Sequence, residues 1–180
     1  MNHAALIIFQ HANDLHTDIL NDKNLSHLKP YLHEIGEHLS QLNKKVRRYI
    51  DDSINDVIIE YTDDTTNFIE QAQNCYMRRM VTKVKYEHLE TATNICLMCR
   101  MLNDTIYMYN KTVNIQTKSW GNDFENLRLA CNRLLTKYDC MLNDNNNYID
   151  VPEADTVFTN MYNYIIKKLK IKKTSKHLHN

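Results

Sequence analysis

One helical pattern dominates the sequence: residues 28–61 read LKPYLHEIGEHLSQLNKKVRRYIDDSINDVIIEY. Apolar or aromatic residues recur in this stretch at steps of three or four, the spacing that places side chains on one face of an α-helix. They are Leu28, Leu32, Ile35, Leu39, Leu42, Val46, Ile50, Ile54, Val57 and Tyr61. Because no proline follows Pro30 in the stretch, the pattern predicts one long amphipathic helix, about 51 Å in length.

The composition favours an all-α fold around this helix. The 180 residues include only two Gly and two Pro, and the Asn-Gly and Asp-Gly pairs that turn β-hairpins do not occur. Apolar residues make up 43% of the chain, which is enough for a core. We therefore expect an irregular bundle of five or six helices in a single domain over residues 1–166, followed by a basic tail over residues 167–180.

Helical spacing outside the long stretch predicts the other members of the bundle. Helices are expected over residues 2–20, 65–85 and 87–110, then from residue 122 and from Asp150. The pattern does not decide whether residues 81–86 separate two helices or continue one.

The C-terminal tail carries the densest charge in the chain. Residues 167–180 hold six Lys and no acidic residue, so the preceding 166 residues have a net charge of −6. Such a cluster serves nuclear import, nucleic-acid contact or, less often, binding to anionic membranes. The alternative is a solvated helix end whose cations suit the helix dipole. Five of the six Lys are the candidates for nuclear import or nucleic-acid contact: Lys167, Lys168, Lys170, Lys172 and Lys173.

Candidate metal and catalytic patterns are weak. His33 and His38 are five residues apart, which turns them about 140° from each other on a helix, so they do not share one zinc ion. The CLMC motif that begins at Cys96 lies within a helical pattern, where thiols behave as small apolar residues. The alternative is a zinc site of four thiols: Cys96, Cys99, Cys131 and Cys140. Nucleophile signatures and phosphate-binding Gly loops do not occur, so we predict no enzyme, no cofactor and no metal.

The sequence also predicts an intracellular protein. The apolar run Ala4–Phe9 is too short for a secretory signal, and no run approaches the roughly 18 apolar residues of a membrane span. The five Cys are then expected to be reduced.

Part of the long helix resembles the death-motif helix of the Bcl-2 family, an apolar ladder in which a small residue precedes an acid. The residues that carry the resemblance are Leu28, Leu32, Ile35, Gly36, Glu37 and Leu39. The family's acid is usually Asp, and here it is Glu37. Trp120-Gly121 also resembles the Trp-Gly of the family's groove signature, although Asn122 replaces the Arg that follows. The resemblance implies an apoptosis regulator that uses helix-in-groove binding.

The overall texture resembles that of small accessory proteins of large insect DNA viruses, baculovirus late expression factors among them. It shows in the Asn-rich run from Leu142 to Tyr148, in the Met, Cys and Tyr of residues 96–109, and in the scarcity of Gly. This resemblance implies a viral factor that supports late gene expression or its transcription in the host nucleus and cytoplasm.

Together these patterns predict a non-enzymatic interaction protein that acts through protein partners, with nucleic-acid binding through the tail as the alternative. Gly36 is one of two glycines and costs about 1 kcal/mol relative to Ala inside a helix, so a neighbouring helix or a partner is expected to pack closely there. The surplus length of the helix over residues 28–61 also makes self-association an expectation.

Overall fold

The described part of the chain is built of helices alone. A computed structural model describes residues 1–22, 25–138 and 150–178, with side chains to residue 171, and no strand occurs among them. The helices are α1 (His3–Leu20), α2 (Lys29–Tyr49), α3 (Asp52–Asp64), α4 (Thr66–Met80), α5 (Tyr86–Thr112), the 3-10 turn η1 (Lys118–Trp120), α6 (Gly121–Lys137) and α7 (Pro152–Leu178). The predicted all-α bundle is confirmed, with seven α-helices in these ranges.

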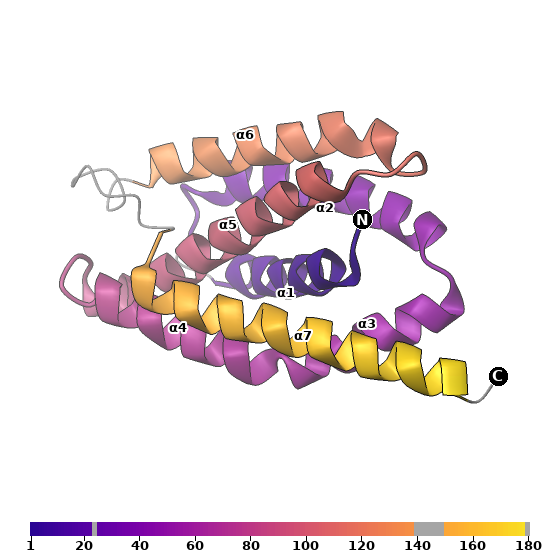
Figure 1. Ribbon diagram of the computed structural model, residues 1–180. Coiled ribbons are helices and arrows are strands. Elements are labelled where there is room, and N and C mark those ends of the chain that lie inside the picture. The colour runs from indigo at the N-terminus through magenta and orange to yellow at the C-terminus, as the bar shows by residue number, and fades with distance from the viewer. Residues whose placement is uncertain (23–24, 139–149, 179–180) are drawn as a thin grey trace.

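The helices form three layers of two, with one helix at an end of the bundle (Figure 1). The middle layer consists of α1 and α5, which pack along each other. On one side of it lie α2 and α6, and on the other side lie α4 and α7. The seventh helix, α3, contacts α1 and α4 and leaves a gap toward the end of α2.

The stretch expected to form one long helix is two helices, and this part of the prediction is wrong. The first ends at Tyr49, and Ile50 has an extended backbone with φ −90° and ψ 133°. The Asp51 carboxylate then accepts a hydrogen bond from the Ile54 amide at 3.0 Å and caps α3. An N-cap requires a non-helical backbone, so the capping signal DDS at 51–53 overrides the continuing apolar spacing.

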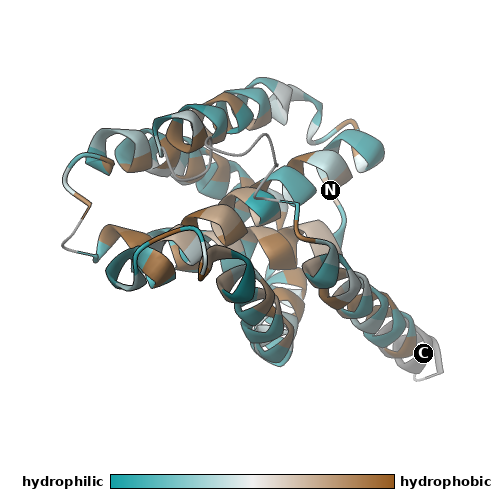
Figure 2. Ribbon diagram, turned by 90° about the vertical axis from the view of Figure 1, so that its left-hand side faces the viewer, coloured by the Kyte–Doolittle hydropathy of each residue, from teal (hydrophilic) through white to brown (hydrophobic). Residues whose placement is uncertain are grey.

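The middle layer is buried on nearly all sides. Most of the N-terminal half of α1 and most of α5 have almost no solvent exposure, and the apolar sides of the other helices turn toward them (Figure 2). Residues at helical spacing along one face of α5, such as Leu89, Ile95 and Leu102, are buried, and so are neighbours such as Leu97, Met98 and Met101. An amphipathic pattern therefore predicts too few buried residues in α5, because neighbouring helices cover this helix from several directions.

An ion-pair network joins α5 to α7. Arg100 donates hydrogen bonds to Asp104 Oδ2 at 3.1 Å and to Asp155 Oδ1 at 2.6 Å, and its guanidinium lies 4.6 Å from the centroid of the Phe158 ring. Tyr162 donates to the same Asp104 carboxylate at 2.7 Å. Burial raises the pKa of Asp104 in spite of the Arg100 charge. These contacts join α7 to α5, and the largely buried charges of Arg100 and Asp104 each have an oriented partner.

The helix boundaries show how residues 81–85 and the C-terminal segment are built. Residues 81–85 are not helical, so α4 and α5 are separate helices. The segment expected as a basic tail continues α7 as a helix to Leu178, and this end extends beyond the bundle (Figures 1 and 2). Among the described helices, none combines the length and apolar character needed to cross a bilayer.

Candidate functional site

The apolar ladder that resembles a death motif faces the interior of this chain. Its four apolar residues are buried where α2 packs against α6 and α1, whereas Glu37 is exposed. They can contact a partner only if α2 leaves the bundle, and the partner-binding role of this ladder stays a prediction. Trp120 is also buried, at the start of α6.

Close packing at Gly36 is confirmed, and the neighbour is α1. A Cβ atom at Gly36 would lie 3.0 Å from Cε1 of His16. The His16 ring is held there because its Nε2 is 2.8 Å from the Leu32 carbonyl oxygen, which only accepts, so Nε2 donates. Burial lowers the pKa of His16, so the ring packs as a neutral group.

The Lys residues predicted for nuclear import or nucleic-acid contact all lie on the C-terminal part of α7. Lys167 and Lys170 are exposed on α7, and the Lys168 ammonium lies 5.6 Å from the centroid of the Tyr164 ring. Lys172 and Lys173 belong to the same helix, but their side chains lie outside the described residues, as do the run 142–148 and the thiol of Cys140.

The buried thiols do not assemble a metal site. Cys96, Cys99 and Cys131 are buried thiols, and the hydrogen bond with the Cys131 thiol together with burial raises the pKa of Cys99. Within the described part of the chain, no group of three or more His, Cys, Asp or Glu is placed to hold a metal ion. The three thiols therefore pack as apolar residues.

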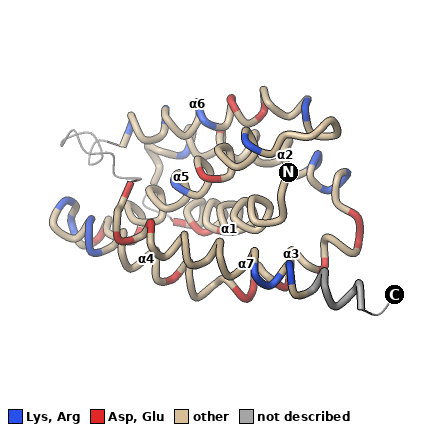
Figure 3. The backbone as a smooth tube through the Cα atoms, in the orientation of Figure 1, with Lys and Arg blue, Asp and Glu red and all other residues tan. Residues whose placement is uncertain are grey.

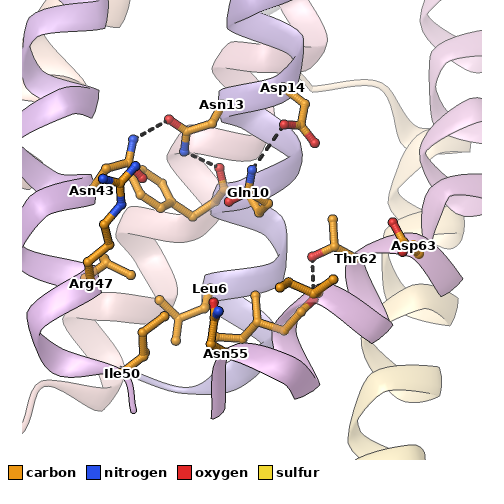
Figure 4. A pocket seen from close by; sticks show the side chains of 14 residues that line it. Leu6, Gln10, Asn13, Asp14, Asn43, Arg47, Ile50, Asn55, Thr62 and Asp63 are labelled. Carbon is orange, nitrogen blue, oxygen red and sulfur yellow. Dashed lines mark hydrogen bonds between the residues drawn. The ribbon is translucent and has the colours of Figure 1, made fainter. Parts of the chain in front are cut away.

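A groove opens where α2 and α3 diverge over α1 (Figure 4). Its volume is about 460 Å³, within the range of ligand-binding clefts. Apolar side chains from all three helices line it: Leu6, Phe9, Val46, Ile50, Ile58 and Ile59. Ile59 is 53% exposed, so the groove offers apolar surface that the chain itself leaves uncovered.

Polar side chains on α1 form one rim of the groove, and hydrogen bonds within the protein hold them in place. Asn43 of α2 donates to the Asn13 side-chain oxygen at 2.7 Å, and Asn13 donates to the Phe9 carbonyl at 2.7 Å (Figure 4). Gln10 donates to Asp14 at 3.1 Å. These bonds set the separation of α1 and α2, so the rim exists before any partner arrives.

Opposite charges face each other across the groove. Arg47 of α2 is exposed and has no ionic partner among the described side chains, whereas Asp14 of α1 and Asp63 of α3 lie on the other side. His11, close to Asp63, has its pKa lowered to about 4 by burial, so it is neutral at pH 7 and does not offset the Asp63 charge. The groove therefore has one cationic and one acidic wall.

The groove continues along α1 and α2 beyond this widest part. A second hollow of about 370 Å³ runs to Gly36 and shares five lining residues with the first: Gln10, Asn13, Asp14, Asn43 and Arg47. On α2 the two extend from Gly36 to Ile50, which is about 21 Å at 1.5 Å per helical residue. That length matches a bound helix of about four turns.

The one hydroxyl among the described residues around the wider part of the groove is engaged within its own helix. It belongs to Thr62, which donates to the Ile58 carbonyl at 2.7 Å.

Sequence reasoning missed this groove because it depends on the break at Ile50. The continuing apolar spacing concealed the break, and only the capping signal at Asp51 could have revealed it. The wall residues are far apart in the sequence, so no local pattern joins Asp14, Arg47 and Asp63.

Comparison of the chain with protein-family models, with curated proteins and with solved structures gives no match in any of the three.

Proposed function

We propose that the chain is a non-enzymatic interaction protein that binds an amphipathic helix of a partner protein in the groove between α1, α2 and α3. The observation that carries the proposal is an open groove with an apolar floor and walls of opposite charge. A partner helix with apolar residues at i, i+3, i+4 and i+7 suits such a floor.

The charges specify the chemistry and orientation of the partner. Its apolar stripe lies on Ile58 and Ile59, its basic side faces Asp14 and Asp63, and its acidic side faces Arg47. Rim charges of this kind fix orientation and speed association more than they add affinity. The pre-formed rim on α1 lowers the ordering cost of binding.

The occupant is a partner helix because the described chain has no free segment directed into the groove. The groove's length of about four helical turns and its mixed charge fit a helix with both signs on its flanks. A second copy of the chain is the competing occupant, and the experiment below separates the two.

A display selection tests the proposal directly. The full chain is immobilised and used to select from a library of helical peptides about 14 residues long. We expect enriched peptides to carry the apolar spacing of one helix face and basic residues along one flank. Binding should fall about tenfold or more with Ile59→Asp, because a charge then occupies the apolar floor, and should be unchanged with Leu129→Asp on α6, where Leu129 is also partly exposed.

Equal binding by the two variants, or no enriched amphipathic sequence, contradicts the proposal. Light scattering on the peptide-free chain provides the second readout. A dimer that Ile59→Asp converts to a monomer assigns the groove to a second copy of the chain and contradicts the partner-helix assignment.

A further inference from the structure

The connection between α5 and α6 presents an apolar residue to solvent at its tip. Ile115 is 95% exposed, and Val113 two residues earlier is 42% exposed. These residues precede η1 and α6, and the connection lies beside the C-terminal end of α2 (Figure 1).

Hydrogen bonds hold this connection on both sides of Ile115. Asn114 accepts from the Thr117 amide at 3.0 Å and donates to the Tyr49 hydroxyl at 3.2 Å. Tyr109 donates to the Thr117 carbonyl at 2.6 Å, and Thr117 is fully buried. The exposure of Ile115 is therefore a feature of an ordered loop, and ordering an apolar side chain in water gives no stability in return.

A cleft with cationic and aromatic lining lies beside the tip. Its volume is about 480 Å³, and it is lined by Lys45, Arg48, Tyr49, Gln116, Ser119 and Trp120. The Trp120 and Tyr49 rings meet edge to face with centroids 5.5 Å apart and close its base. Arg48 is exposed, and it forms no ion pair with any of the described side chains.

Cations outnumber acids around the tip and the cleft. Lys111 lies in the last turn of α5 with its ammonium 4.4 Å from the centroid of the Tyr107 ring, and Lys118 follows in η1. Lys45 forms an ion pair with Asp123 and Arg48 adds a further charge, so the lining of the cleft holds two cations and no acidic residue. Figure 3 shows Lys and Arg at this end, on the end of α2 and on the connection into α6.

We propose that this end of the molecule docks on an anionic membrane surface, with Ile115 entering the lipid and the cleft at Arg48 holding a lipid headgroup. An apolar tip surrounded by cations is the combination that anchors peripheral proteins, because apolar burial and attraction to anionic lipid add. A single-stranded nucleic acid fits less well, since base stacking needs open aromatic faces and Trp120 is only 5% exposed. Docking of this kind needs no membrane-spanning helix.

Vesicle sedimentation with the full chain tests the proposal. The probes are vesicles of phosphatidylcholine alone and of phosphatidylcholine with phosphatidylserine. We expect partition onto the anionic vesicles only, lowered about tenfold by Ile115→Asn and about fivefold by Arg48→Ala. Matched controls at the other end of the molecule are Val81→Asn, which changes an apolar residue 56% exposed, and Lys137→Ala, which removes one exposed cation (Figure 1).

Trp120 provides an independent readout because it is the only Trp in the chain. Its fluorescence should be quenched by anionic vesicles that carry brominated acyl chains. Absence of binding, equal loss in the control variants, or binding without quenching would each overturn the proposal. Loss of binding on Lys167→Ala with no effect of Ile115→Asn would assign the attraction to α7 instead and would also overturn it.

Discussion

Acidification should destabilise the protein in part through the buried side chain of His11. Its Nε2 lies 2.7 Å from the Thr65 hydroxyl oxygen, and that hydroxyl donates to the Tyr61 carbonyl at 2.6 Å. Thr65 therefore accepts from His11, which fixes the neutral ring with its proton on Nε2. Burial lowers the pKa of His11 to about 4, while the nearby Asp63 charge acts in the opposite direction.

The sign and size of the effect follow from proton linkage. The unfolded chain binds a proton at His11 near pH 6.5 and the folded chain only near pH 4, so the unfolded state holds more protons between these values. The free energy of unfolding therefore falls as the pH is lowered through this window. From pH 7.5 to pH 5 the loss due to His11 is about 2 kcal/mol.

Urea unfolding of the wild type and of His11→Gln at the two pH values measures this contribution. Gln keeps a nitrogen donor for Thr65 but does not titrate, so the pH-dependent loss should shrink by about 2 kcal/mol. Replacement of the exposed His33 by Gln is the matched control and should leave the loss unchanged. A His11→Gln variant that loses as much stability on acidification as the wild type would refute the assignment of a buried neutral ring.

Three further substitutions test other contacts by the same unfolding measurement. Gly36→Ala should destabilise the protein by about 1 kcal/mol, because the new Cβ atom meets the His16 ring, which its own hydrogen bond holds in place. The control Gly121→Ala should be neutral or stabilising, because a Cβ atom there has no neighbouring atom within 4 Å. Equal effects of the two substitutions would contradict the close packing at Gly36. Asp51→Ala should cost about 1 kcal/mol through loss of the α3 cap, and no loss would mean that the cap does not define the break. Asp104→Asn should cost about 2 kcal/mol because it removes one of the two carboxylates that pair with Arg100, and an unchanged midpoint would contradict that network.

Periodicity predicted the buried residues of α2, but it predicted neither where that helix ends nor which residues of α3 are buried. Ile54 and Val57 are only partly buried, and Ile58 is buried instead. Leu32, Ile35 and Leu42 have no exposure at all, as one helical face requires. The apolar positions at Ile50 and Ile54 continue the same spacing across the break, so the stripe alone gives no sign of it. The helix break is set at Asp51, because its carboxylate accepts a hydrogen bond from the Ile54 amide, which in a continuous helix would donate to a backbone carbonyl.

Sequence patterns could not predict the candidate site, and the reason is a different one. Its floor and walls come from three helices, and the distance between Asp14 and Asp63 along the chain carries no information about their approach. The expectation of close packing at Gly36 succeeded because the propensity cost of a helical glycine is a local quantity that a contact must offset. Identifying the neighbour as His16 required the angle between α1 and α2.

Amide hydrogen exchange of the full chain, with and without the strongest peptide from the helix selection, tests the central claim most directly. If the groove is the binding site, exchange should slow in residues 6–14, 36–50 and 55–63, which line its three sides. Residues of α6 should exchange at the same rate in both states, because that helix packs behind α2 and does not line the groove. Protection on α6 or α7, with the three groove segments unchanged, would contradict the account.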